Sequence, residues 1–343
     1  MNLKTLGWPS DMHQDIDVSS LARVTAVHRS HMRALTEKGE INLHIPGSLE
    51  DLPVVGDWVL TTPEFEDEQG EPARLVKEVL TRSSILARWT DRGEQPMAAN
   101  VDTVFIVTSA NLDFKLNRLH RFILLVRKGG AEPVVILSKT DLVENSSDLV
   151  REIEDKLQLK VIGTSIVNDS GMAKVLELMP EGSTSVFVGS SGVGKSSLVN
   201  RIMGEEVQLT SGIREDDAKG RHTTTARQMF VVDGHGLIID TPGVREVQIF
   251  GDADDVVGAF PLIEELSQQC KFSNCHHETE PGCAIQEALD SGALDVGEWE
   301  SYLKLQREAD HVKRKMDKAD MANAKKRWKK VSRLVREIKK SKR

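Results

Sequence analysis

The stretch VGSSGVGKSSLVN, residues 188–200, decides the fold class of this chain. It matches the phosphate-binding loop G-x-x-x-x-G-K-[ST], with its fixed points at Gly189, Gly194, Lys195 and Ser196. The apolar run before the loop predicts a strand, and SLVNRIM after it predicts a helix. Backbone N–H groups of such a loop converge on phosphate oxygens at the start of the helix, so the stretch predicts a nucleotide-binding α/β domain. The loop nevertheless follows 187 other residues, whereas it normally follows the first strand of its domain.

The residues on both sides of the loop continue the α/β pattern. Apolar runs that read as strands alternate with amphipathic segments that read as helices, which predicts a mostly parallel sheet covered on both faces. The predicted strands are VDTVFIVTS, PVVIL, KVIGTS, MFVVDG and GLIID, and the predicted helices are LNRLHRFILLVRK, DLVREIEDKLQL and GMAKVLELM.

The regions before and after this α/β domain have different patterns of apolar and polar residues. Residues 20 to about 95 hold short alternating apolar runs separated by turn residues, which predicts a small OB-like β-barrel, with a small β-sandwich as the alternative. The runs that read as strands are LARVTAV, INLHI, GDWVLTT, ARLVKEVL and SSILARW. After residue 255 the pattern is helical, interrupted by a cysteine-containing loop, and the last 40 or so residues read as one long basic helix. We therefore expect three domains, at residues 1–97, 98–252 and 253–343.

Composition and charge exclude some classes of protein. No apolar run approaches 18 residues, no signal peptide is visible, and three cysteines make no disulfide framework, which favours a cytoplasmic protein. The net charge of −8 hides an asymmetry. Residues 313–343 hold 15 Lys and Arg against three acids, a net +12, which leaves −20 for the rest of the chain. A basic tail on an acidic body indicates a polyanionic partner, and RNA is favoured over a membrane because the apolar stripe of the tail is narrow.

Further polar residues fit a magnesium-nucleotide site. Lys195 would reach the β- and γ-phosphates, and the Ser196 hydroxyl would bind Mg²⁺. Asp240 ends a predicted strand in the sequence DTPG, where it would hold the metal through water while Gly243 presents an amide to the γ-phosphate. Thr224 in GRHTTT would complete the metal shell; Thr223 is the alternative, and a plain strand start would also explain three threonines.

The tetrad SKTD, residues 138–141, indicates which base is bound. It is similar to the guanine motif N-K-x-D, in which the aspartate accepts hydrogen bonds from guanine N1 and its exocyclic amine while the lysine stem lies along the base. Asp141 and Lys139 are present, but Ser138 replaces asparagine and lacks its amide donor, so we expect weaker guanine binding with specificity retained. Thr164 and Ser165 resemble the element whose backbone supports the base, with Ile166 in place of its alanine.

The order of these motifs explains the late phosphate loop. The guanine tetrad and its support precede the loop, and the threonines and DTPG follow it, so the set is complete but circularly permuted. Permutation is admissible where the original termini lie close together. It also leads the segment after DTPG directly into the C-terminal region.

The sequence CKFSNCHHETEPGC, residues 270–283, contains all three cysteines of the chain. Cys270, Cys275 and Cys283 with one histidine would make a closed tetrahedral Zn²⁺ site, which is structural because it leaves no open position. On spacing alone His276 and His277 are equivalent, and unrelated buried cysteines are the alternative.

The permuted order, GRHTTT, DTPG and the cysteine cluster together resemble the ribosome small subunit-dependent GTPase A family (RsgA, or YjeQ). The resemblance covers nearly the whole chain and implies an OB-like barrel, a permuted GTPase domain and a zinc domain in which His277 is the fourth ligand. It implies GTP with Mg²⁺ as cofactor and a monomer that binds the small (30S) ribosomal subunit and its 16S rRNA during late maturation. The nucleotide-binding residues expected from motif and resemblance are Ser138, Lys139, Thr140, Asp141, Thr164, Ser165, Gly189, Ser190, Ser191, Gly192, Val193, Gly194, Lys195, Ser196, Ser197, Asp240 and Gly243.

Hydrolysis needs a group that orients the attacking water. Many GTPases use a glutamine directly after the D-x-x-G glycine, but here that residue is Val244, which cannot hydrogen-bond to water. His222 is the nearest candidate and the resemblance agrees, so we expect His222, Lys195 and Thr224 to serve catalysis. The alternative for His222 is an exposed loop residue with no catalytic role. Arg221 would stabilise developing negative charge or contact RNA. Slow turnover stimulated by the subunit is the expected behaviour. A nucleotide-binding RNA scaffold with little hydrolysis and a P-loop small-molecule kinase are the competing hypotheses.

Overall fold

The computed structural model describes residues 2–8, 16–27, 32–90, 93–110, 116–204, 227–240, 256, 260–311 and 313–314. Contacts divide the chain into two compact units. The first comprises Met1–Arg88 with Glu94–Gln248, and the second comprises Trp89–Gly93 with Ile249–Arg343. Among the described residues, no helix is both long and apolar enough to cross a bilayer.

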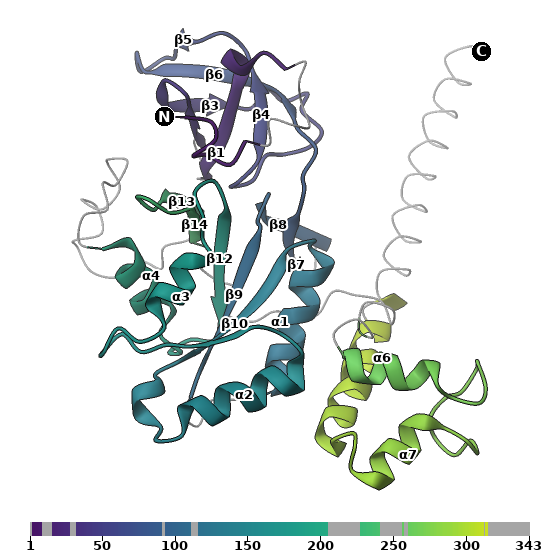
Figure 1. Ribbon diagram of the computed structural model, residues 1–343. Coiled ribbons are helices and arrows are strands. Elements are labelled where there is room, and N and C mark those ends of the chain that lie inside the picture. The colour runs from purple at the N-terminus through teal and green to yellow at the C-terminus, as the bar shows by residue number, and fades with distance from the viewer. Residues whose placement is uncertain are drawn as a thin grey trace, which may run out of the picture. The chain divides into compact units, whose positions relative to one another are not determined.

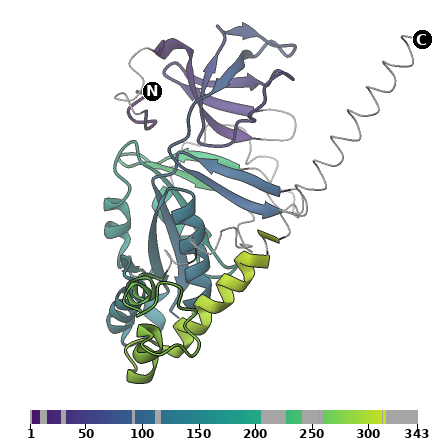
Figure 2. The same ribbon diagram turned by 90° about the vertical axis from the view of Figure 1, so that its right-hand side faces the viewer.

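A closed five-stranded barrel forms the N-terminal part of the first unit (Figure 2). The ring runs β1-β2-β3-β6-β4 and closes from β4 back to β1; only β3 and β6 pair in parallel. This is the order of an OB-type barrel, as the sequence predicts. The strands are β1 (Leu21–Val27), β2 (Met32–Thr36), β3 (Gly39–His44), β4 (Trp58–Thr61) and β6 (Pro72–Val79), with the short β5 (Phe65–Glu66) added to β6.

One predicted strand lies outside the barrel. The run SSILARW contributes to β7 (Ile85–Thr90), which pairs with β8 (Gly93–Ala99) as a separate two-stranded ribbon. The alternating pattern fits both arrangements, because a ribbon with one covered face shows the same period of two as a barrel strand.

The α/β part is a six-stranded sheet in the order β11-β10-β9-β12-β14-β13 (Figure 1). Its strands are parallel except β13, which runs antiparallel to β14. They are β9 (Thr103–Ser109), β10 (Glu132–Ser138), β11 (Val161–Gly163), β12 (Thr184–Gly189), β13 (Arg227–Val231) and β14 (Leu237–Asp240).

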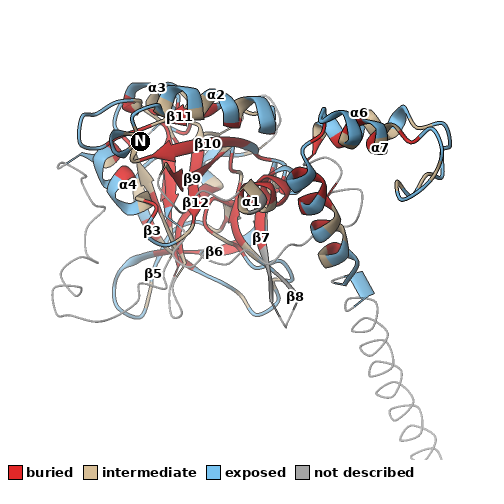
Figure 3. Ribbon diagram, turned by 90° about the horizontal axis from the view of Figure 1, so that it is seen from below, coloured by how far each residue is buried: buried red, intermediate tan, exposed pale blue. Residues whose placement is uncertain are grey.

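Helices cover this sheet, and Figure 3 shows the strands buried beneath helices whose outer surfaces are exposed. Helices α3 (Met172–Glu177) and α4 (Lys195–Met203) lie on one face, and α1 (Leu116–Lys128) and α2 (Ser146–Leu157) lie on the other. Phe105 of β9 and Phe187 of β12 stack at 4.8 Å in the core beneath α3 and α4. Burying such side chains stabilises the sheet by roughly 1.5–3 kcal/mol each.

The barrel joins the α/β sheet through backbone hydrogen bonds. Ala26 and Val27 of β1 pair antiparallel with Gln228 and Arg227 of β13. The buried side chain of Arg23 lies at the same junction. The barrel is therefore continuous with the edge of the nucleotide-binding sheet.

The second unit contains α6 (Pro261–Gln268), α7 (Ala284–Ser291) and a helix over residues 296–311. Aromatic contacts hold it together: Tyr302 packs edge-on against Phe260 at 5.5 Å and stacks on Trp299 at 5.2 Å. The predicted basic helix at the C-terminus lies outside the described residues from residue 315 onward.

Candidate nucleotide and metal sites

The phosphate loop connects the end of β12 to the start of α4. Gly189 has φ 142°, and a Cβ there would lie 2.2 Å from the carbonyl oxygen of Val107 on the neighbouring strand. Gly194 caps α4 with φ 94°, and the helix begins at Lys195. The strand–loop–helix arrangement predicted from the motif is therefore present, and the loop needs glycine at both positions.

The ammonium group of Lys195 folds back over the loop. Its Nζ donates to the carbonyl oxygens of Gly189 and Ser190 at 2.7 and 2.6 Å. Ser191, Ser196 and Ser197 are exposed. The loop thus presents a lysine and a row of hydroxyl and amide groups on one surface, which is the donor set that a phosphate chain requires.

The guanine tetrad lies directly beside the phosphate loop. β10 ends at Ser138, Lys139 takes the left-handed conformation with φ 59°, and Thr140–Leu142 form a 3₁₀ turn that leaves Asp141 exposed. The Nζ of Lys139 donates to the carbonyl oxygen of Gly192 at 2.8 Å. The lysine stem therefore crosses toward the phosphate loop, where it can lie along a base bound by Asp141.

Ser138 bonds to the phosphate loop. Its buried hydroxyl lies 2.6 Å from the carbonyl oxygen of Val193 and 3.0 Å from that of Thr108. A hydroxyl has one proton, so the shorter contact is the preferred hydrogen bond. The sequence indicates only the loss of the asparagine amide, whereas the structure shows that the serine still joins the tetrad to the loop.

The predicted base support lies next to the tetrad. Thr164 and Ser165 are buried, and the Thr140 N–H donates to the carbonyl oxygen of Thr164 at 3.1 Å. Ser165 Oγ accepts from the Val167 N–H at 3.2 Å, while Ile166 is exposed. Three segments that are separate in sequence, residues 138–141, 164–165 and 189–197, therefore meet at one end of the sheet.

Asp240 lies at the end of β14, paired with Gln228 of β13. The residue as a whole is exposed, but partial burial of its carboxyl group raises the pKa of Asp240 above the ordinary value, and the Lys195 ammonium opposes that shift. The carboxyl group of Asp240 is therefore near enough to Lys195, the first residue of α4, for the two charges to interact. A bound Mg²⁺ would stabilise the Asp240 carboxylate, because its positive charge offsets the cost of burying a negative charge.

Several predicted residues lie outside the described part of the chain. These are Thr224 and its alternative Thr223, His222, Arg221, Gly243 and Val244. Their roles stay predictions from the sequence.

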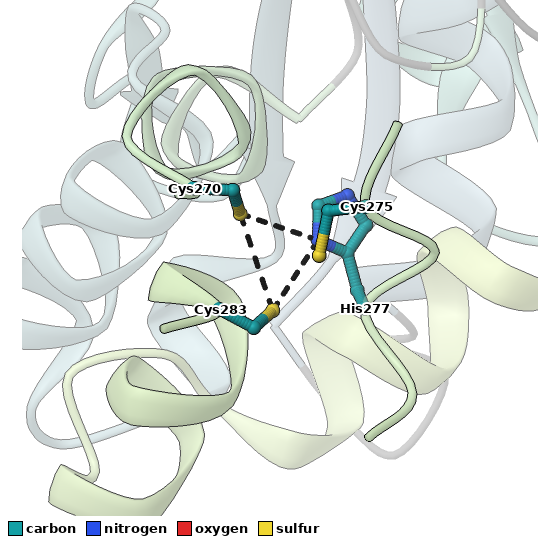
Figure 4. Close-up of side chains that lie close together, drawn as sticks. All are labelled: Cys270, Cys275, His277 and Cys283. Carbon is teal, nitrogen blue, oxygen red and sulfur yellow. Dashed lines mark hydrogen bonds between the residues drawn. The ribbon is translucent and has the colours of Figure 1, made fainter. Parts of the chain in front are cut away.

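The cysteine cluster brings four side chains to one point (Figure 4). The ligand atoms of Cys270, Cys275, His277 and Cys283 all lie within 4.8 Å of one another. His277 Nδ1 is 3.5 Å from Cys270 Sγ and 3.4 Å from Cys283 Sγ, and the two sulfurs are 4.0 Å apart. Tetrahedral Zn²⁺ with ordinary bond lengths would separate sulfur pairs by about 3.8 Å and sulfur–nitrogen pairs by about 3.5 Å. The residues therefore fit zinc, and the structure places His277 rather than the exposed His276 among them.

Local structure sets up this cluster. Cys270 follows α6, and Cys283 is the residue before α7. The loop between them closes through a 3.0 Å hydrogen bond from the Lys271 N–H to the Gly282 carbonyl. His277 has φ 62°, and its carbonyl accepts from the Gln286 side chain at 2.6 Å. These bonds hold both halves of the loop against the helices, so the thiols converge.

Electrostatics of the cluster favour a bound cation. Burial raises the pKa of the Cys275 thiol to about 11; the His277 backbone opposes this shift, while hydrogen bonding of the Cys275 thiol to the sulfurs of Cys283 and Cys270 adds to it. Burial also lowers the pKa of His277, which keeps its ring neutral and able to ligate. A divalent cation would offset the cost of the thiolates by direct bonding.

Glu280 is a residue of this loop that the motif does not identify. Its carboxylate accepts from the backbone N–H groups of His276, Glu278 and Thr279 at 2.9, 2.9 and 3.1 Å. These bonds, led by that of His276, lower the pKa of Glu280 to about 2. The only sequence signal was an acid three residues after a ligand, which is too common to be specific.

Comparisons with known proteins agree with this geometry. The family model of the RsgA GTPase matches residues 79–250. "Small ribosomal subunit biogenesis GTPase RsgA 2" of Vibrio parahaemolyticus is 42% identical over 315 residues, covering 89% of this chain and 85% of that protein. "Small ribosomal subunit biogenesis GTPase RsgA" of Methanosarcina acetivorans is 39% identical over 290 residues, covering 82% of this chain and 78% of that protein.

Two solved structures have a similar fold. The crystal structure of YjeQ from Thermotoga maritima aligns with a TM-score of 0.64 at 28% identity, over 84% of this chain and 98% of that one. YloQ, described as a circularly permuted GTPase, aligns with a TM-score of 0.63 at 26% identity, over 85% of this chain and 95% of that one.

Proposed function

The chain belongs to the RsgA GTPase family, and from this premise we propose that it hydrolyses GTP during biogenesis of the small ribosomal subunit. The observation that carries the proposal is the hydrogen bond of Ser138 to Val193, supported by that of Lys139 to Gly192. These contacts join a guanine tetrad to a phosphate loop that follows it in sequence. A permuted site of this kind fits a guanine nucleotide and the relatives that the chain resembles.

Each part of the site has a role in this proposal. Asp141 accepts hydrogen bonds from the guanine base, and Lys139 covers it. The amides of residues 189–197 and the Lys195 ammonium bind the phosphates. Mg²⁺ would be held by the hydroxyls of Ser196 and Thr224 and, through water, by Asp240, and it would neutralise charge on the β- and γ-phosphates.

The catalytic step is proposed to use His222. Val244 occupies the position where many GTPases have a water-orienting glutamine, so another side chain must orient the water. His222 directly precedes the threonines that would complete the Mg²⁺ shell, so it is adjacent in sequence to residues that would lie near the γ-phosphate. We expect slow intrinsic turnover that rises when the small subunit binds.

The partner surfaces are proposed from charge and fold. Residues 313–343 carry a net +12, which suits the phosphate backbone of 16S rRNA. The OB-type barrel is a second platform by fold analogy. We propose that the chain acts as a cytoplasmic monomer in late maturation of the subunit, with zinc fixing the fold of the C-terminal unit.

Steady-state release of phosphate from GTP tests the proposal. The full chain is assayed alone, with purified small ribosomal subunits, and with large subunits as the matched control. We expect stimulation by small subunits only, and loss of turnover in Lys195→Ala. A turnover rate that is unchanged by either subunit would contradict the ribosomal role. Nucleotide binding without turnover under any condition would favour a scaffold. Phosphorylation of a metabolite would favour a kinase.

A further inference from the structure

Arg118 lies where α1 approaches the phosphate loop. It is the third residue of α1, which follows β9 in the chain. β9 and β12 are parallel neighbours, with Val107 opposite Gly189. The first turn of α1 and the phosphate loop therefore leave adjacent strands at the same end of the sheet, although Arg118 and the loop are about 70 residues apart in sequence.

The guanidinium group of Arg118 bonds to a side chain of the loop. Its Nη1 donates to Ser190 Oγ at 2.7 Å, in a partly buried position. A hydrogen bond from a charged donor in such a place is among the stronger ones in a protein. Ser190 occupies a variable position of the loop motif, where the motif demands no particular side chain.

Ser190 is bonded by two cations at once. Arg118 bonds to its hydroxyl, while the Lys195 ammonium bonds to its carbonyl oxygen at 2.6 Å and to that of Gly189 at 2.7 Å. A lysine ammonium has three protons, so to donate to both the β- and the γ-phosphate Lys195 must release at least one of the two carbonyls. The first turn of the loop then loses a hydrogen bond, whereas the bond from Arg118 to Ser190 Oγ does not involve the carbonyl oxygens.

We propose that Arg118 is a positioning residue for GTP hydrolysis, holding the first turn of the phosphate loop through Ser190 while Lys195 moves from the loop carbonyls to the phosphates. The proposal rests on the GTPase function proposed above. Arg118 acts through the serine rather than on the nucleotide, so its effect depends on the Ser190 hydroxyl. The proposal predicts that removing Arg118 and removing the Ser190 hydroxyl have the same effect on hydrolysis, and that neither change alters the preference for guanine over adenine.

A double-mutant cycle tests this coupling. Arg118→Ala and Ser190→Ala are each expected to lower kcat/KM for GTP about tenfold, and the double variant about tenfold rather than a hundredfold. Arg118→Lys should recover part of the loss, because a lysine can still donate to the hydroxyl. Arg201→Ala is the matched control: it removes an exposed arginine of α4 bonded to Asp169 and should leave kcat/KM unchanged.

Two further measurements separate the explanations. Thermal unfolding of the variants should stay close to that of the parent, since a purely structural role would shift the melting temperature and leave kcat/KM intact. A parent chain that binds GTP but does not hydrolyse it would contradict the proposed function. In that case the same double-mutant cycle, measured on the affinities for GTP and GDP, still tests the coupling of Arg118 to Ser190. The proposal is overturned if the two alanine substitutions have additive effects on kcat/KM. It is also overturned if Arg118→Ala lowers only the affinity for GTP while Ser190→Ala has no effect.

Discussion

Arg23 on β1 of the barrel donates a 2.7 Å hydrogen bond to Oγ1 of Thr184, the first residue of β12. The same guanidinium donates to the carbonyl oxygens of Leu6, Gly56 and Asn100, so it bonds to four segments of the first unit. Burial lowers its pKa to about 10, which leaves it charged at neutral pH. The strand that leads into the phosphate loop is thus tied at its start to the barrel.

We predict that Arg23→Ala destabilises the first unit by roughly 3–5 kcal/mol, because several buried acceptors lose their donor together. Thr184→Val removes one of these bonds and should cost about 1–2 kcal/mol. Arg33→Ala on the neighbouring strand β2 is the control, since its half-buried pair with Glu40 should contribute less than about 1 kcal/mol. Calorimetric unfolding measures the differences, and an Arg23 variant as stable as the control would show that the junction does not depend on this side chain.

Removing the Ser138 hydroxyl should weaken nucleotide binding. Ser138→Ala leaves the buried carbonyl of Val193 without its donor, so we expect affinity for GTP and GDP to fall by about five- to tenfold. Ser185→Ala on β12 is the matched control, because that hydroxyl is buried without a hydrogen-bond partner among the described residues. Titration calorimetry provides the affinities, and equal values for the two variants would refute the role assigned to Ser138.

Local signals made the α/β part predictable. The strand before Gly189 and the helix from Lys195 follow from apolar period and glycine spacing, and β9, β10 and α1 end within a residue or two of the apolar runs that predict them. The alternating pattern predicts the barrel as a class but does not predict β2, because MRALT between two turns carries too short an alternation to stand out. The ribbon of β7 and β8 was missed because pairing partners are a tertiary property that alternation does not encode.

The site shows the same division between local and tertiary information. Lys139, Asp141 and Lys195 follow from motifs whose chemistry requires fixed residue types. Arg118 and Glu280 do not, because an arginine in a helix or an acid in a loop has no special spacing. Their contacts arise only when the sheet brings α1 beside the phosphate loop and when the cysteines close the 270–283 loop.

Asp141→Asn should exchange the base that the site prefers. The amide cannot accept both guanine N–H bonds, so GTP affinity should fall by about a hundredfold or more. Xanthine has a carbonyl in place of the exocyclic amine, to which the asparagine amide can donate, so xanthosine triphosphate should bind the variant better than GTP does. Competition between the two nucleotides checks this. A variant that still prefers GTP would mean that another group reads the base.

Glu280→Ala should weaken zinc binding by roughly tenfold to a hundredfold, because three backbone N–H groups between the ligands lose their acceptor. Glu278→Ala is the control, since its side chain is exposed in the same loop. Competition with a chelating dye compares the variants. Equal zinc affinity in both would show that the ligands alone set the geometry.

Zinc affinity should rise with pH, and the sign follows from the protons that the cluster holds without metal. With a pKa of about 11, the Cys275 thiol is protonated in the metal-free protein at neutral pH, so zinc must expel that proton. His277 has a lowered pKa and is already neutral above about pH 6.5, so it releases none in this range. Between about pH 6.5 and 8.5 the Kd should therefore fall by about tenfold per pH unit for each thiol proton released. In Cys275→Ser the dependence should be shallower by one proton and the binding weaker. A Kd that does not change with pH would mean that the thiolates are formed before the metal arrives.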